Sequence, residues 1–316
     1  MHKIVSNNNT GRRVALMKAN ELDIGFLEKM ILALKKRNFD FISLDEMYNR
    51  LGENHDKKFI VLTFDDGYKD NYTLAYPLLK KLKIPFAIYI TNCYPNHTAK
   101  MWWYMIEDII LENDIVEISL GKEKILFSTK TQKDKDSAFV KIRKQIIDAS
   151  KDLQLEILNN LEDQYKKNLR SYVEREALNW NEITDLASDE LVTIGCHSQN
   201  HYSFNTLSED EILEEINSSK KEIENHLKKN VRHFAYPYGT KNEIGKREIE
   251  IVKNSHLFDT ATTARTGNIF EVHKNELHTL PRVQITGDQE DISIINLYLS
   301  GVLPAVKNKF KRVITV

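Results

Sequence analysis

Apolar and polar residues alternate along the chain in blocks that predict strands followed by helices. Several blocks are continuous apolar runs rich in β-branched and aromatic residues, which is typical of the buried strands of a parallel sheet. Between them, apolar residues recur every three or four positions, as in a helix that packs one face on a sheet. This order predicts an α/β fold with a closed or nearly closed parallel barrel. We expect strands at 39–42, 59–64, 85–90, 191–195, 233–236, 258–262 and 280–285.

The predicted helices have recognisable start signals. Asp23 precedes an apolar stripe at helical spacing, and Ser208 with Glu211 forms a capping-box pattern before another helix. The last clear helix is predicted at 292–299. The stripe after Asp23 consists of Leu27, Met30, Ile31 and Leu34.

Residues 97–178 depart from this alternation. A helix is predicted from Trp102, then a hairpin of 115–120 and 124–127 turning at Gly121, then a long charged helical stretch over about 134–169. The mixed charges of that stretch favour a solvated outer surface, with a partner-binding helix as the alternative. We therefore expect one domain, residues 1–316, with an inserted, mainly helical excursion at about 97–178.

Composition narrows the class of protein. The 316 residues carry 45 basic and 46 acidic side chains, interspersed, which argues against nucleic-acid binding. No apolar run approaches the ~18 residues of a membrane span, and no signal peptide is recognisable, so we expect a cytoplasmic protein. Cys93 and Cys196 lack metal-type spacing and predict buried, reduced thiols, although Cys196 stays open as a soft metal ligand.

Polar residues gather where three predicted strands end. Asp65 and Asp66 follow one strand, His197 and His201 follow another, and Pro237-Tyr238-Gly239 follows a third. The carboxyl ends of buried strands line the ligand crevice of α/β folds. Each pattern alone also fits a plain turn or exposed histidines. Together, two imidazoles and a carboxylate are a common ligand set for a catalytic Zn²⁺ or similar ion.

These motifs resemble those of the polysaccharide deacetylases, which share the NodB homology domain and form carbohydrate esterase family four. The matching segments are Thr63-Phe64-Asp65-Asp66-Gly67, His197-Ser198-Gln199-Asn200-His201 and Phe234-Ala235-Tyr236-Pro237-Tyr238-Gly239, with smaller matches at Leu178-Asn179-Trp180 and Leu280-Pro281-Arg282. The resemblance covers roughly residues 20–290 apart from the excursion. It implies a distorted, incomplete (β/α) barrel of the NodB homology type with a largely helical insertion.

The resemblance also implies roles for individual residues. Asp66, His197 and His201 would hold a divalent metal, with Zn²⁺ expected and Co²⁺ or Ni²⁺ as alternatives. Asp65 would be the general base. The backbone N–H of Tyr238 would stabilise the oxyanion.

The sequence departs from the family pattern at two points. An arginine often stands two residues before the proline of the third motif, where this chain has Ala235. Arg282 is the expected substitute, with a surface or phosphate-binding role as the alternative. The family also has a late Leu-x-His motif that supplies the general acid, and Leu277-His278 lacks its spacing. His278 is therefore the candidate acid, and an exposed loop histidine is the alternative. Asp259 loosely fits a further expected aspartate.

The expected function is metal-dependent hydrolysis of N-acetyl groups on an amino-sugar poly- or oligosaccharide, or a glycolipid, in surface-polysaccharide biosynthesis. A carbohydrate O-acetyl esterase and a noncatalytic carbohydrate-binding protein with a vestigial metal site are the alternatives. Trp102 and Trp103 either stack on sugar rings or pack the excursion against the barrel. The sequence gives no signal for the oligomeric state.

Overall fold

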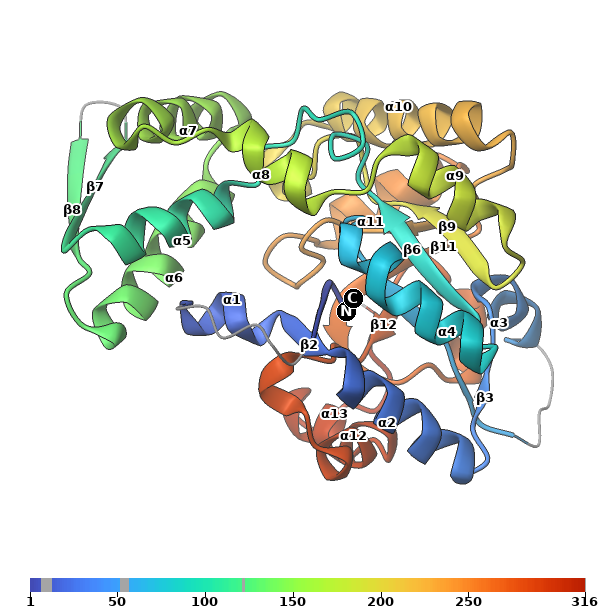
Figure 1. The fold of residues 1–316 in the computed structure, drawn as a ribbon. Coiled ribbons are helices and arrows are strands. Elements are labelled where there is room, and N and C mark those ends of the chain that lie inside the picture. Colours follow the sequence, from blue (N-terminus) through green and yellow to red (C-terminus); the bar gives the residue numbers. More distant parts are fainter. Residues whose placement is uncertain (7–12, 52–56, 121–122, 316) are drawn as a thin grey trace.

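The computed structural model describes residues 1–6, 13–51, 57–120 and 123–315 (Figure 1). Its centre is a curled sheet of six parallel strands in the order β12-β11-β10-β9-β6-β5. In the described chain the edge strands β5 and β12 do not pair, so the barrel is incomplete, as the family resemblance implies, and not closed. The strands are β5 (Leu62–Phe64), β6 (Phe86–Ile90), β9 (Val192–Cys196), β10 (His233–Ala235), β11 (Thr260–Thr266) and β12 (Leu280–Arg282).

The apolar run 59–64 is divided between two sheets, which corrects the prediction of one strand. β4 (Phe59–Ile60) pairs with β3 (Asp40–Phe41), whereas β5 pairs with β6. A third pair joins β1 (Lys3–Val5) to β2 (Glu21–Asp23). The break brings the end of β5 to the open side of the half barrel, next to β1.

Helices between the strands cover the outside of the half barrel. Asp23 caps α2 as predicted, because its carboxylate accepts a hydrogen bond from Phe26 N–H, and Ser208 with Glu211 forms the predicted capping box. The apolar faces of the sheet and of these helices other than α3 form the main core, while Leu44 and Met47 of α3 belong to a smaller one. These elements are α2 (Ile24–Lys36), α3 (Leu44–Arg50), η1 (Asn71–Ala75), α4 (Tyr76–Leu82), α9 (Trp180–Ser188), η2 (Phe204–Thr206), α10 (Glu209–Leu227) and α11 (Lys246–Asn254).

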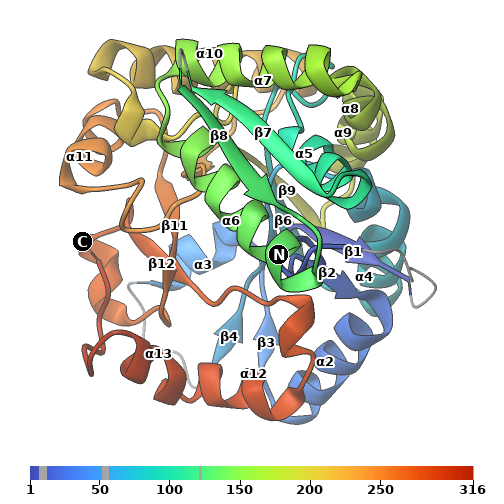
Figure 2. The ribbon, with the colours of Figure 1, turned by 90° about the vertical axis from the view of Figure 1, so that its left-hand side faces the viewer.

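The predicted excursion forms a second group of elements with its own core, in front of the half barrel in Figure 2. The hairpin is confirmed, while Gly121 lies outside the described residues. The charged stretch 134–169 is not one helix, because Ala149 is extended and Ser150 caps a new helix. The elements are α5 (Trp102–Glu112), β7 (Ile115–Leu120), β8 (Glu123–Ser128), α6 (Gln132–Asp148), α7 (Lys151–Tyr165) and α8 (Leu169–Glu176), with α1 (Ala15–Ala19) packed against them.

The C-terminal region contributes one predicted helix and one that was not predicted. α12 (Ile292–Leu299) is followed at once by α13 (Val302–Lys307), the two are in contact, and they follow one another along the lower edge of Figure 2. Short 3₁₀ turns, η3 (Glu271–Asn275) and η4 (Gly287–Gln289), precede them. Within the described ranges no helix has the length and apolar character needed to cross a membrane.

Candidate active site

The ends of β5 and β9, the two strands that pair with β6, bring the three predicted metal ligands together. Asp66 lies just beyond β5, and His197 and His201 follow β9. Nε2 of each histidine lies 3.3 Å from Asp66 Oδ1. One ligand atom from each residue can be chosen so that all three lie within 4.8 Å of one another.

The chemistry of these three side chains fits a divalent cation. Asp66 Oδ1 is buried and has no hydrogen-bond partner among the described residues, although two imidazoles lie beside it. His197 Nδ1 lies 2.7 Å from the Ala235 carbonyl, so this nitrogen carries the proton and Nε2 offers its lone pair. Ligand atoms about 2.0–2.1 Å from a tetrahedral ion are about 3.3 Å apart, which matches the two His–Asp distances.

The backbone at the site is held in an uncommon conformation. Asp66, His201 and Tyr238 have φ of 76°, 60° and 60°, in the left-handed region that non-glycine residues seldom occupy. Such residues cost about 1–3 kcal/mol each and cluster at functional sites. Gly239 also has a positive φ, and a Cβ there would lie 2.7 Å from Ala264 N. The third motif therefore requires glycine at this position.

Asp65 is paired with the arginine expected to replace the one missing at Ala235. Arg282 Nη1 and Nη2 donate to the two Asp65 oxygens at 2.7 and 2.8 Å, and Nε donates to Thr263 O. Burial alone would raise the pKa of Asp65, but the guanidinium offsets it and holds that pKa well below its usual range. Asp65 is therefore a carboxylate oriented by a bidentate contact.

A histidine to which the sequence motifs assigned no role, His2, also lies at the site. Asp65 N–H donates to Met1 O (3.0 Å), which places His2 Nε2 3.9 Å from Asp65 Oδ2. The His2 side chain is 31% exposed and lines the same cavity as Asp65. No local sequence pattern predicts this contact, because it depends on β1 lying beside the end of β5.

A cavity of about 400 Å³ opens over these residues. The insertion supplies part of its wall, since Trp102 is buried and Trp103 is half-buried with its ring centre 6.4 Å from that of His201. The Tyr238 ring packs edge-to-face on His201, and its backbone N–H has no acceptor within the described chain. Arg143 of α6 lies over the other side of the Tyr238 ring.

Comparison with known proteins identifies the family. A family model described as polysaccharide deacetylase matches residues 52–119 and 142–252, more than half of the chain. The chain belongs to the polysaccharide deacetylase family. It is therefore a deacetylase, a hydrolase, as its motifs predict. None of the curated proteins matches it.

Solved structures share the fold of this deacetylase at low sequence identity. The deacetylase PplD of Streptococcus pyogenes, in complex with acetate, is 17% identical with a TM-score of 0.60, over 94% of this chain and 95% of that one. A de-N-acetylase from Aggregatibacter actinomycetemcomitans is 14% identical with a TM-score of 0.56, over 94% of this chain and 97% of that one. IcaB from Ammonifex degensii is 16% identical with a TM-score of 0.55, over 93% of this chain and 95% of that one.

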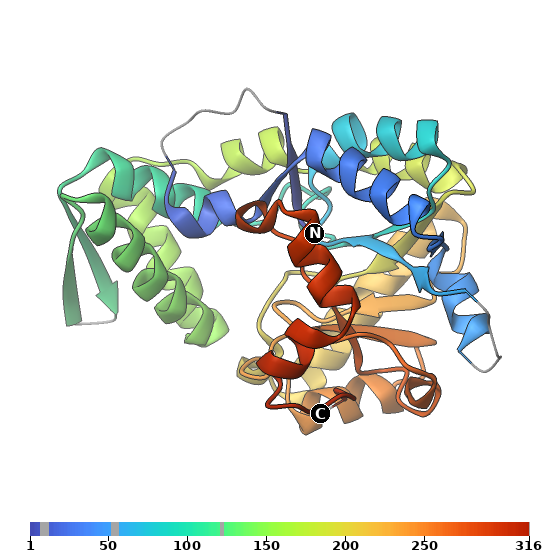
Figure 3. The same cartoon turned by 90° about the horizontal axis from the view of Figure 1, so that it is seen from below.

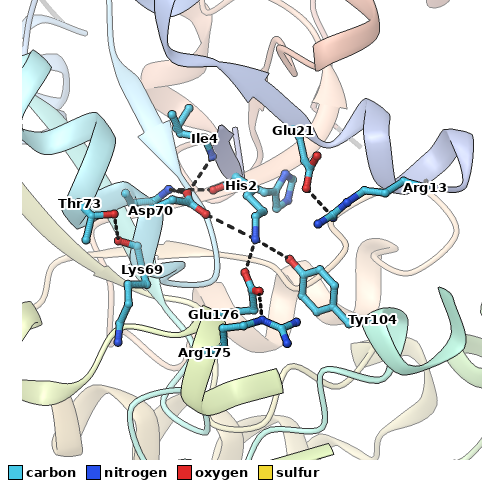
Figure 4. Close-up of polar contacts among 12 residues, drawn as sticks. His2, Ile4, Arg13, Glu21, Lys69, Asp70, Thr73, Tyr104, Arg175 and Glu176 are labelled. Carbon is cyan, nitrogen blue, oxygen red and sulfur yellow. Dashed lines mark hydrogen bonds and ion pairs between the residues drawn. The ribbon is translucent and has the colours of Figure 1, made fainter. Parts of the chain in front are cut away.

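A buried polar network connects the insertion of the deacetylase to β1, the strand that directly follows His2 (Figure 4). Lys3 Nζ contacts Glu176 of α8, donates to the Tyr104 hydroxyl of α5 at 3.3 Å and lies 3.8 Å from Asp70 Oδ2. Asp70 in turn accepts from Ile4 N–H at 2.8 Å. The network fixes β1 between barrel and insertion, and so fixes the position of His2.

The deacetylase does not bring His278 or Asp259 to the site. His278 Nε2 lies 3.0 Å from Phe258 O, and Asp259 pairs with Arg232. Both residues precede their strands, whereas Asp65 and Asp66 follow theirs, and the strands are parallel. They therefore lie at the opposite end of the sheet, which corrects the expectation that His278 is the general acid.

Both cysteines of the deacetylase are free and buried, as predicted. Cys196 Sγ lies 3.1 Å from the Ser219 hydroxyl. It is not a member of the ligand cluster found in the described ranges, so nothing supports it as a soft metal ligand.

Proposed function

We propose that this deacetylase is a metal-dependent de-N-acetylase acting on an amino-sugar-containing poly- or oligosaccharide, or a glycolipid that carries one. The observation that carries the proposal is the unpartnered Asp66 Oδ1 facing His197 and His201, one residue away from the Asp65–Arg282 pair. Two imidazoles and one carboxylate leave room for water and substrate on the ion. Zn²⁺ is the expected ion, with Co²⁺ or Ni²⁺ as alternatives.

Asp65 has the surroundings of a general base. When bound, a divalent ion lowers the pKa of water from about 15.7 to about 7 and polarises an acetyl carbonyl. Asp65 is kept ionised and oriented by Arg282, so it is ready to accept a proton from the attacking water.

Two further groups would serve the later steps. The Tyr238 N–H is placed to donate to the developing oxyanion, a contact typically worth ~3 kcal/mol. His2 lies beside Asp65 and is placed to protonate the departing amine, the role that His278 cannot fill from the other end of the sheet. This proton donor favours an N-acetyl group over an O-acetyl ester as the substrate, because the nitrogen must be protonated before the amine can leave.

The cavity and the related folds support the proposed substrate class. Trp103 offers a half-buried ring beside the ligand His201, suited to stacking on a sugar. The fold is shared with a protein described as a de-N-acetylase and with a deacetylase that holds acetate. We therefore propose N-acetyl removal from a carbohydrate as the reaction, and we propose surface-polysaccharide assembly as its setting on the family resemblance alone.

We further propose that residues 1–316 form a single deacetylase domain with an insertion at about 97–178. The insertion has a core of its own, yet its α5, α6 and α8 supply cavity and network residues to the barrel. The family match is interrupted between 119 and 142, within the insertion.

The proposal is tested by acetate release. The protein is stripped with a chelator, reloaded separately with Zn²⁺, Co²⁺ or Ni²⁺, and supplied with N-acetylglucosamine oligomers and with O-acetylated sugars. Metal-dependent acetate release from the amides supports the proposal. Release from the esters alone would favour an O-acetyl esterase, and glycan binding with no release from the metal-loaded protein would favour a noncatalytic binding protein.

A further inference from the structure

Exposed apolar side chains are concentrated in the C-terminal hairpin, which we define as residues 297–313. Of the ten large apolar side chains that are exposed in the described chain, five lie there. The largest of them, Phe310, is 82% exposed. The others are Leu297, Val302, Val306 and Val313.

The same segment is strongly basic. Residues 297–313 contain four basic side chains and no aspartate or glutamate, in a chain whose net charge is −1. All four are exposed, and none forms an ion pair with a carboxylate of the described ranges. Lys307 Nζ donates to the Tyr298 hydroxyl and lies 5.0 Å from the centre of that ring, and Arg312 lies over the Phe270 ring. The four are Lys307, Lys309, Lys311 and Arg312.

The backbone presents these residues toward solvent. Val302 and Val306 are four residues apart and share one face of α13. Lys309 and Phe310 follow with φ of 52° and 65°, which ends the helix and leaves the Phe310 ring outside the protein. A bulky residue in this region is a conformational outlier. Packing within the described chain does not compensate for it, because so little of the ring is covered.

The C-terminal hairpin adjoins the active-site cavity. Ile295 and Leu299 of α12 line the cavity, and α12 packs against α13 (Figure 3). A surface that bound the C-terminal hairpin would therefore lie close to the wall of the cavity.

We propose that the C-terminal hairpin docks the deacetylase on an anionic lipid bilayer. Apolar side chains among unpaired lysines and arginines are the composition of interfacial membrane anchors, in which rings enter the headgroup region and cations meet anionic lipid. A second copy of this chain fits poorly, because a two-fold contact would bring like charges together. Docking is independent of the proposed reaction and would bring the cavity near substrates carried on lipid.

The test is sedimentation of the full chain with vesicles of pure phosphatidylcholine or of phosphatidylcholine with 30% phosphatidylglycerol. We expect binding to the anionic vesicles only, weakened at 1 M NaCl. Replacing Lys309, Lys311 and Arg312 by Gln should weaken it on the order of 100-fold, since each charge near the surface contributes about fivefold. Phe310→Ser should weaken it roughly 10-fold.

A matched control removes one apolar and three basic side chains that are exposed in the insertion instead. It combines Leu126→Ser with Lys130→Gln, Lys133→Gln and Lys141→Gln. It should bind like the parent. Each variant should keep the parent's thermal unfolding midpoint. Absence of parent binding to anionic vesicles, equal binding to both vesicle types, or equal loss in the control would overturn the proposal. So would a dimer in light scattering that Phe310→Ser dissociates without vesicle binding by the parent.

Discussion

Arg282 and Asp65 form a bidentate ion pair between β12 and the end of β5, the two edge strands of the half barrel. The strands themselves do not pair in the described part of the chain, so side chains connect the sheet where a closed barrel would have backbone hydrogen bonds. Arg282 also donates to Thr63 Oγ1 of β5 at 3.3 Å. One arginine thus joins the open edges and orients the proposed base.

Arg282→Gln should therefore damage both stability and turnover. It leaves a buried Asp65 carboxylate without its charged partner, a change that typically costs 3–5 kcal/mol. We expect kcat to fall at least ~100-fold, because the base loses its orientation. Arg232→Gln is the control, since Arg232 makes similar pairs with Asp45 and Asp259 on the surface, where they contribute about 0–1 kcal/mol. Urea unfolding and acetate release measure both; equal effects of the two changes would contradict the assignment.

Asp65 and Asp66 should separate into different roles on mutation, although they are adjacent. Asp65→Asn should retain the metal but lower turnover at least ~100-fold, because the amide cannot accept the proton. Asp66→Ala should lose the ion itself, because it removes one of three ligands. Elemental analysis of the purified variants, beside acetate release, gives the comparison. Metal retained by Asp66→Ala, or lost from Asp65→Asn, would reverse the proposed roles.

His2 and His278 provide a matched pair of histidine substitutions. His2→Gln should lower kcat by about 10²–10⁴-fold on amides, the usual contribution of a general acid. The loss should be smaller on O-acetyl esters, because an alkoxide can leave without prior protonation, whereas an unprotonated nitrogen would have to leave as a far more basic amide anion. His278→Gln should keep nearly full activity, because His278 lies at the other end of the sheet. An equal loss on both substrates would point to a structural role for His2.

The clustering of Asp66, His197 and His201 was predictable from sequence, whereas the residues around the cluster were only partly predictable. Asp66, His197 and His201 each lie just after a recognisable strand, and parallel strands bring their ends to one edge. Arg282 was anticipated from the gap at Ala235. His2 was not, because its place depends on β1 lying beside β5, a tertiary relation that no local pattern encodes.

The predicted boundaries of strands and helices were wrong where the sequence pattern continued without a break. The apolar run 59–64 looks like one strand, yet the chain changes sheets at Val61, and apolar character alone does not say which sheet a residue joins. The charged stretch 134–169 keeps helical spacing across its break, so the Ser150 cap was overlooked. α13 was missed because it is a helix of six residues that contains Pro304.

The buried carboxyl of Glu107 in α5 should make stability fall as pH rises. Burial raises the pKa of Glu107 to about 7, against the attraction of Arg13 and the hydrogen bond from Val14 N–H, with Glu21 nearby. Because its folded pKa exceeds the unfolded value of about 4.5, the folded state binds more protons between these values. The contribution of Glu107 to stability is therefore fully present below about pH 4.5 and is lost as the pH rises to about 7. The loss is at most about 3 kcal/mol.

Glu107→Gln should remove this slope while its amide oxygen keeps the bond to Val14. Urea unfolding of parent and variant at pH 5, 6, 7 and 8 measures the difference. The free energy of unfolding of the variant should rise relative to that of the parent between pH 5 and 7. Above pH 7 the difference between the two should become constant. A gap that does not change with pH would show that the carboxyl is ionised throughout.

Gly239→Ala tests whether the left-handed backbone of the third motif serves the chemistry. The added Cβ would lie 2.7 Å from Ala264 N at a φ of 63°, so the loop must shift, at a cost of at least ~1 kcal/mol. Because Tyr238 precedes this residue, its N–H would move away from the oxyanion, and kcat should fall at least ~10-fold with a smaller change in KM. Gly245→Ala is the control, since its Cβ would meet only the flexible Glu248 carboxylate and should cost less than ~1 kcal/mol. If Gly239→Ala destabilised the protein but kept the parent's kcat below its unfolding temperature, the loop would shape the fold without contributing a donor to the transition state.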